Sequence, residues 1–69
     1  MKRQQIIKNL REAAKAAGVE FREVEWTRHT ALHVGDKVTT LGRHREIAEV
    51  TAKKIYKQFE TELGEGWWK

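Results

Sequence analysis

The hydrophobic periodicity of this chain changes along its length, and that change constrains the fold more than any other feature. Apolar residues recur every three or four positions over residues 3–17 and again over residues 48–62, which is the spacing of an amphipathic helix with one buried face. Between them, residues 29–34 alternate apolar and polar side chains, and residues 37–41 continue as a Val-Thr segment. The pattern predicts a helix at each end of the chain and strands between them.

Glycines mark where these elements end. Gly18 follows the first helical segment, in the position of a left-handed C-cap. Gly64 ends the second helical segment. Gly35 and Asp36 form a two-residue hairpin signal between two of the predicted strands. We therefore expect those two strands to be antiparallel neighbours.

Residues 19–26 are predicted to form the first strand, although their apolar positions change phase. Val19 and Phe21 fall on one face, whereas Val24 and Trp26 fall on the other. Either a β-bulge in the middle of the strand reconciles the two pairs, or one pair is exposed. We expect Trp26 to lie at the edge of the core.

The second strand separates its side chains cleanly between two faces. Thr30, Leu32 and Val34 share one face, and His29 and His33 share the other. The apolar set should pack against the helices. This places both histidines on the open side of the sheet.

Together these segments predict a single α+β domain over residues 1–69, with the element order α-β-β-β-α. The three strands would form one antiparallel sheet, and the two helices would cover one of its faces. A chain of 69 residues buries only about 60% of the surface that its unfolded state exposes. We therefore expect a small core.

The composition limits the cellular compartments and the classes of partner that we expect for this chain. The chain has no cysteine, which excludes disulfides and thiolate metal sites and fits a cytoplasmic location. It has no run of about 18 apolar residues and no secretory signal, so we expect no membrane association. The net charge of +4 favours an anionic partner, and nucleic acid is the leading class.

The residue types present exclude several kinds of site. On a strand, His29 and His33 would lie about 13 Å apart, which is too far for them to share one metal ion. The chain has no cysteine and no serine, and it lacks the GxSxG, Walker A and GxGxxG motifs. We therefore expect neither a metal nor another cofactor.

Metal-free acid–base chemistry on RNA remains open to His29. RNA carries its own nucleophile, the 2′-hydroxyl, so an enzyme must only move protons and neutralise charge on the phosphate. Histidine, with a pKa of about 6.5 in model peptides, can move those protons, and guanidinium or ammonium groups can neutralise the charge. An exposed histidine beside an arginine is equally typical of an ordinary surface, so the residues alone leave both interpretations open.

The order of these features resembles the HicA family of toxins, which are small RNA-cleaving proteins of bacterial and phage toxin–antitoxin modules. The basic start Met1–Arg3 precedes an amphipathic helix, His29 opens the second strand, and Leu32 follows three residues later. The Val-Thr segment Val38–Leu41 then leads into the basic junction Arg43–Ile47. The resemblance covers essentially the whole chain and depends on order and spacing rather than on one motif.

The resemblance implies a fold like the double-stranded-RNA-binding domain and the activity of a metal-independent mRNA endonuclease. It implies that His29 is the catalytic histidine and that mRNA is the substrate. It also implies a HicB-type antitoxin that covers the active site. A non-catalytic RNA-binding module and a protein-interaction domain are the alternatives for a chain of this fold.

Further basic residues are candidates for contacts with the RNA backbone. They lie beside the histidines and on the second helix: Arg28, Arg43, His44, Arg45, Lys53, Lys54 and Lys57. His44 either contacts phosphate, donates a proton or anchors the junction to the core. Charge runs of this kind often pair with neighbouring carboxylates instead.

Two departures from the pattern of the family lie close to these residues. The family usually has a glycine-rich turn before its histidine, and this chain has Trp26-Thr27-Arg28 there. The family often has a proline before the basic junction, and this chain has Gly42. The C-terminal Trp67-Trp68 pair is expected either to fold back over the small core or to stack on bases or on a partner.

Overall fold

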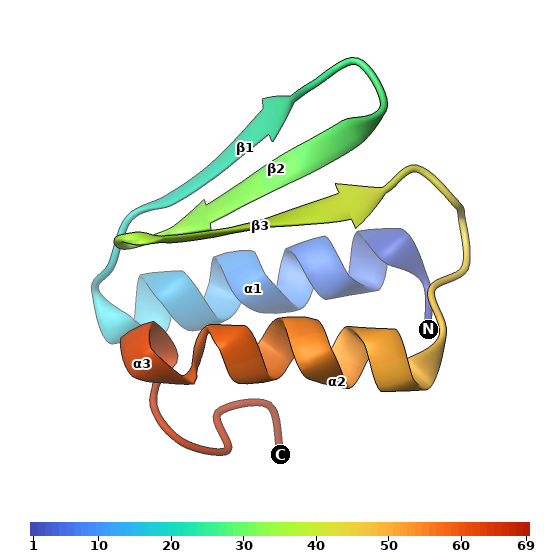
Figure 1. Cartoon of the computed structure of the whole chain (residues 1–69). Coiled ribbons are helices and arrows are strands. Elements are labelled where there is room, and N and C mark those ends of the chain that lie inside the picture. The colour runs from blue at the N-terminus through green and yellow to red at the C-terminus, as the bar shows by residue number, and fades with distance from the viewer.

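The computed structural model describes residues 1–69 and confirms the α-β-β-β-α order (Figure 1). The elements are α1 (Arg3–Ala17), β1 (Phe21–Glu25), β2 (His29–Val34), β3 (Lys37–Gly42), α2 (Glu49–Gln58) and the short α3 (Glu60–Leu63). The strands form one antiparallel sheet in the order β1-β2-β3. Helices α1 and α2 lie side by side against this sheet and run in the same direction. None of the helices combines the length and the apolar character needed to cross a bilayer.

Helix α1 has the predicted bounds and the predicted buried face. Ile6, Ile7, Leu10 and Ala14 are all buried. Gly18 ends the helix in the left-handed conformation, with φ of 72°, which a residue without a Cβ adopts at little cost.

The helix predicted over residues 48–62 is interrupted at Phe59, which separates α2 from α3. The N–H of Phe59 donates to the carbonyl of Tyr56 at 3.1 Å, a tighter turn than the α-helix makes. The Phe59 ring is fully buried in the core. Helix α3, which follows this break, contacts α1.

The two faces of β2 are those that the sequence predicts. Thr30, Leu32 and Val34 are fully buried beneath the sheet, and His29 on the opposite face is exposed. The turn after β2 contains Gly35 with φ of 58°, which confirms the predicted hairpin.

Strand β1 pairs with β2 along its whole length without a bulge. Val24 and Trp26 therefore lie on the open face, and Trp26 is 50% exposed, so the expectation that Trp26 joins the core edge is wrong. The N–H of Trp26 donates to the carbonyl of His29 at 2.8 Å. This bond closes the two-residue turn at Thr27–Arg28 and keeps Trp26 in register, on the face away from the helices.

The C-terminal tryptophans fold back over the core, as one of the two sequence expectations proposed. Trp67 and Trp68 both pack against the hydrophobic core. The Trp67 ring meets the Tyr56 ring edge-on at a centroid distance of 4.8 Å, and its Nε1 donates to the Tyr56 carbonyl at 2.9 Å. The tail thus covers one side of α2.

Replacing Trp67 with alanine should lower the free energy of unfolding by about 2 kcal/mol, because it removes a ring that packs against the core and one hydrogen bond. Urea denaturation followed by circular dichroism measures this change. Trp26→Ala is the matched control, since that ring is half exposed, and its effect should stay within about 0.5 kcal/mol. Equal losses in the two variants would contradict the packing described for the tail.

Burial raises the pKa of Tyr56 above its ordinary value of 10.0, and the hydrogen bond from Asn9 opposes part of that effect. The folded state then holds the phenolic proton more tightly than the unfolded state does. The protonated phenol of Tyr56 therefore makes its full contribution to the stability of the fold below pH 10.0. That contribution is lost as the pH rises further. Urea unfolding between about pH 8 and pH 11 should show a steeper loss for the wild type than for Tyr56→Phe. Parallel curves would contradict this.

Candidate functional site at one end of the sheet

The N-terminus and the junction between β3 and α2 lie side by side, as Figure 1 shows. The Met1 amino group donates to the Ile47 carbonyl at 2.8 Å, and the Ile47 N–H donates to the Met1 carbonyl at 2.7 Å. The Arg3 N–H donates to the Arg45 carbonyl at 3.0 Å. These backbone bonds fix two basic segments beside each other although they lie more than 40 residues apart in the sequence.

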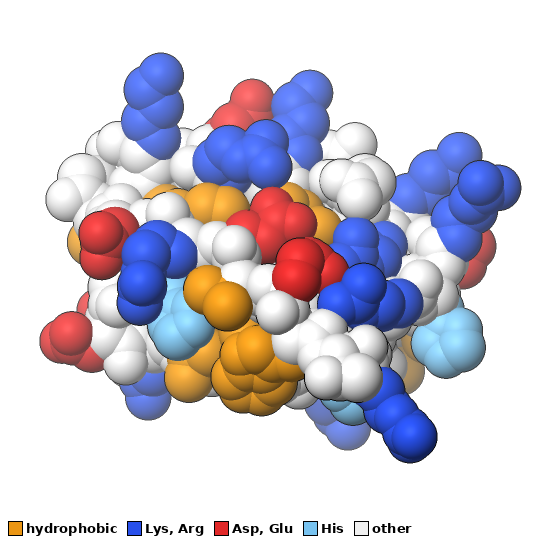
Figure 2. Space-filling view, turned by 90° about the horizontal axis from the view of Figure 1, so that it is seen from above, with side chains coloured by type: hydrophobic (Ala, Val, Ile, Leu, Met, Phe, Trp, Pro, Cys, Tyr) orange, Lys and Arg blue, Asp and Glu red, His pale blue; other side chains and the backbone are white.

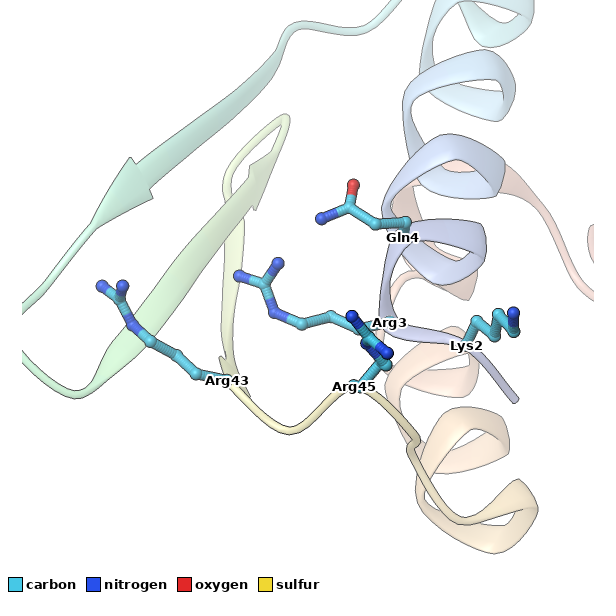
Figure 3. Close-up of a pocket in the computed structure, with 5 residues that line it drawn as sticks. All are labelled: Lys2, Arg3, Gln4, Arg43 and Arg45. Atoms are coloured by element: carbon cyan, nitrogen blue, oxygen red, sulfur yellow. The ribbon is translucent and has the colours of Figure 1, made fainter.

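A cavity of about 450 Å³ opens between these two segments. Its lining contains no apolar and no acidic side chain and consists of Lys2, Arg3, Gln4, Arg43 and Arg45. Figure 3 shows Lys2, Arg3 and Gln4 projecting from the start of α1, and Arg43 and Arg45 projecting from the junction. The first turn of α1 carries no acidic residue, so the positive end of the helix dipole adds to the charge at this place.

Arg3 serves mainly to hold the structure together. Its side chain is only 14% exposed. Its Nε donates to the Gly42 carbonyl at 3.1 Å, and its Nη2 donates to the buried hydroxyl of Thr30. A Glu25 carboxylate oxygen lies 4.0 Å from Nη2. The guanidinium therefore contacts all three strands.

Arg43 is also paired within the chain. Its Nη2 lies 2.7 Å from a carboxylate oxygen of Glu25 and donates to the carbonyl of Trp26. The same carboxylate therefore serves both Arg3 and Arg43. Lys2 and Arg45 have no acidic partner within 4.0 Å, so these two cations are the ones available to an incoming anion.

The exposed histidines at this end of the molecule come from two segments. His29 begins β2 and His44 lies in the junction, and both are exposed. Arg28 is exposed in the turn before His29 and has no ion pair. His33 is partly buried near the other end of β2, where it pairs with Val38. The sheet end therefore gathers His29, His44 and Arg28 close to the cavity residues.

Lysine and arginine side chains are spread over the face of the molecule that lies above the sheet. Figure 2, which looks down on Figure 1 from above, shows several of them at the right of the molecule and others along its upper and left edges. Histidine side chains appear at the left, at the right and at the lower edge of the same view, and apolar side chains are exposed in its lower centre. Basic side chains and histidines therefore share this face of the molecule.

The structure brings together only part of the predicted set. Arg43 and Arg45 line the cavity. The predicted contacts on α2 (Lys53, Lys54 and Lys57) are exposed but do not line it, because α2 packs beneath the sheet and directs them to solvent elsewhere. Sequence reasoning missed Lys2, Arg3 and Gln4 as members of the site. A basic start with no acidic residue in the first turn was the available signal.

The cavity suits binding of an anion, because four of its five lining side chains are cationic. No three His, Asp or Glu side chains lie close enough together to hold a metal ion. Comparisons with protein-family models, curated proteins and solved structures found no match to this chain.

Arg45→Gln should weaken binding of a single-stranded oligonucleotide and reduce the slope of log affinity against log salt by about 0.7, the value for one phosphate contact. Fluorescence anisotropy at several salt concentrations measures both quantities. Lys37→Gln removes the same charge at the opposite end of β3 and is the matched control. If both variants change the slope equally, the cavity is not a preferred phosphate site.

Proposed function

We propose that this chain is a metal-independent endoribonuclease of a toxin–antitoxin module, as its resemblance to the HicA family implies, with mRNA as its substrate in the cytoplasm. The observation that carries the proposal is the exposed imidazole of His29 at the same end of the sheet as a cavity lined by four cationic side chains. The first can move a proton, and the second can hold phosphate.

The chemistry requires little beyond these groups. His29 takes the proton of the 2′-hydroxyl, which then attacks the neighbouring phosphorus atom. Lys2 and Arg45, which have no acidic partner in the chain, bind the phosphate backbone and offset the charge that develops on the phosphate oxygens. Arg28, adjacent to His29 in the turn, contributes a further cation.

The remaining residues predicted to contact RNA differ in whether they would bind it directly or position other residues. Arg43 is partly neutralised by Glu25, so its main role is to position the turn before His29. Lys53, Lys54 and Lys57 remain predictions for nucleotides farther along the strand, since they lie outside the cavity.

We also propose a HicB-type antitoxin as the protein partner, seated on the open face of the sheet. Trp26 is 50% exposed and Val38 is 49% exposed there, and large apolar side chains of this kind are favoured in protein interfaces. Trp26 pairs with His29 across the turn. A partner that covers the tryptophan would therefore also cover the catalytic histidine.

A non-catalytic RNA-binding module is the second candidate. The cavity favours it, because phosphate binding by Lys2 and Arg45 needs no histidine. The two candidates differ in what they predict for His29 alone. Removal of that imidazole abolishes cleavage in the first and leaves the main function of the protein intact in the second.

His29→Ala should reduce cleavage of a mixed-sequence RNA by about 100- to 10,000-fold, the usual contribution of a general base or acid. The assay contains EDTA, and RNA affinity is measured in parallel by anisotropy. His33→Ala is the matched control, since His33 lies on the same face near the other end of β2. Undiminished cleavage by His29→Ala, or intact RNA with the wild type, would refute the proposed mechanism.

A further inference from the structure

The geometry points to a second proton-transfer group beside His29, and this inference rests on the proposed ribonuclease function. His29 and Gly42 are direct partners across β2 and β3. Directly opposed residues in an antiparallel pair direct their Cβ positions to the same face. Leu41, the preceding residue, is buried on the helix side, so the Cβ position of Gly42 faces outward, as the side chain of His29 does.

His44 lies beside the position that a side chain on Gly42 would take. A Cβ placed on Gly42 would lie 3.7 Å from Cδ2 of His44, and apart from the two neighbours of Gly42 in the chain no other residue comes within 4 Å of that position. The Cβ positions of a directly opposed pair lie about 4.5–5.5 Å apart. The Cδ2 atom of His44 is therefore within about 9 Å of the Cβ of His29.

Two imidazoles at this separation, on one face, can reach opposite sides of a single phosphodiester group. His29 comes from the start of β2, and His44 comes from the junction after β3. Both are exposed. Neither makes a side-chain hydrogen bond or an ion pair within the chain, so both rings are available to substrate.

The other acidic and basic groups at this end are already engaged or are poorly suited to donate a proton. Glu25 is paired with Arg3 and Arg43, and Glu46 lies 3.5 Å from the N-terminal amino group. Arginine keeps its proton at any pH at which the protein is folded. Lys2 is assigned to the phosphate oxygens, and a lysine ammonium is a weaker acid than an imidazolium.

We propose that His44 is the general acid of the reaction. His29 removes the proton from the 2′-hydroxyl, O2′ bonds to phosphorus, and the bond from phosphorus to O5′ breaks. The imidazolium of His44 gives its proton to the departing O5′. The products are a 2′,3′-cyclic phosphate and a free 5′-hydroxyl. His29 ends protonated and His44 neutral, and exchange with water restores both.

The test compares two RNAs that differ in one atom. The first is an oligonucleotide containing the site that the wild-type protein cleaves. The second carries sulfur in place of the leaving O5′ at that site. Thiols are far stronger acids than alcohols, with a pKa of about 8.5 for cysteine, so a departing thiolate needs no proton donor. Wild type, His44→Ala, His44→Gln and His29→Ala are assayed on both RNAs, with circular dichroism as the check on folding.

We expect both His44 variants to lose about 100- to 10,000-fold of the rate on the oxygen-containing RNA and to recover most of it on the sulfur-containing RNA. His29→Ala should remain slow on both, because its task precedes departure of the leaving group. Wild-type rates from the folded His44 variants, or equal losses on the two RNAs, would overturn only the role proposed for His44 and would leave the ribonuclease proposal intact. Failure of the wild type to cleave any RNA would overturn the ribonuclease proposal and this role with it.

Discussion

The largely buried guanidinium of Arg3 is the contact on which this end of the molecule depends. It joins the first turn of α1 to the carbonyl of Gly42 and to the hydroxyl of Thr30, and the Glu25 carboxylate balances its charge. Thr30 is fully buried. Loss of the guanidinium would leave polar groups without partners at a place that water reaches poorly, which costs more than the hydrogen bonds themselves contribute.

That arrangement divides the basic residues into two groups with different tasks. Arg3 and Arg43 share Glu25 and hold the turn, the strand ends and the junction in fixed positions. Lys2 and Arg45 have no such partner, so no carboxylate of the chain offsets their charge. A count of positive residues would not separate these groups, because the separation depends on where a single carboxylate lies.

Hydrophobic periodicity correctly predicts most of the fold, and each wrong prediction has a local cause. The bounds of α1 and the faces of β2 follow from side-chain spacing, because each is set by neighbours within a few positions. The expectation that Trp26 lies at the core edge is wrong, since the ring is 50% exposed. The closed turn before His29 keeps it on the open face instead. The break at Phe59 had no signal in the pattern, since its ring continues the apolar stripe.

The sequence by itself determined the order of the elements, the open face that carries His29 and the presence of a basic junction, because periodicity and turn residues act over short distances along the chain. Only the tertiary structure decided that the junction lies against the N-terminus, that Arg3 is structural and that His44 lies over Gly42. Those contacts join segments that meet only when the helices pack on the sheet and Gly42 comes opposite His29. No pattern among neighbouring residues in the sequence predicts these long-range contacts.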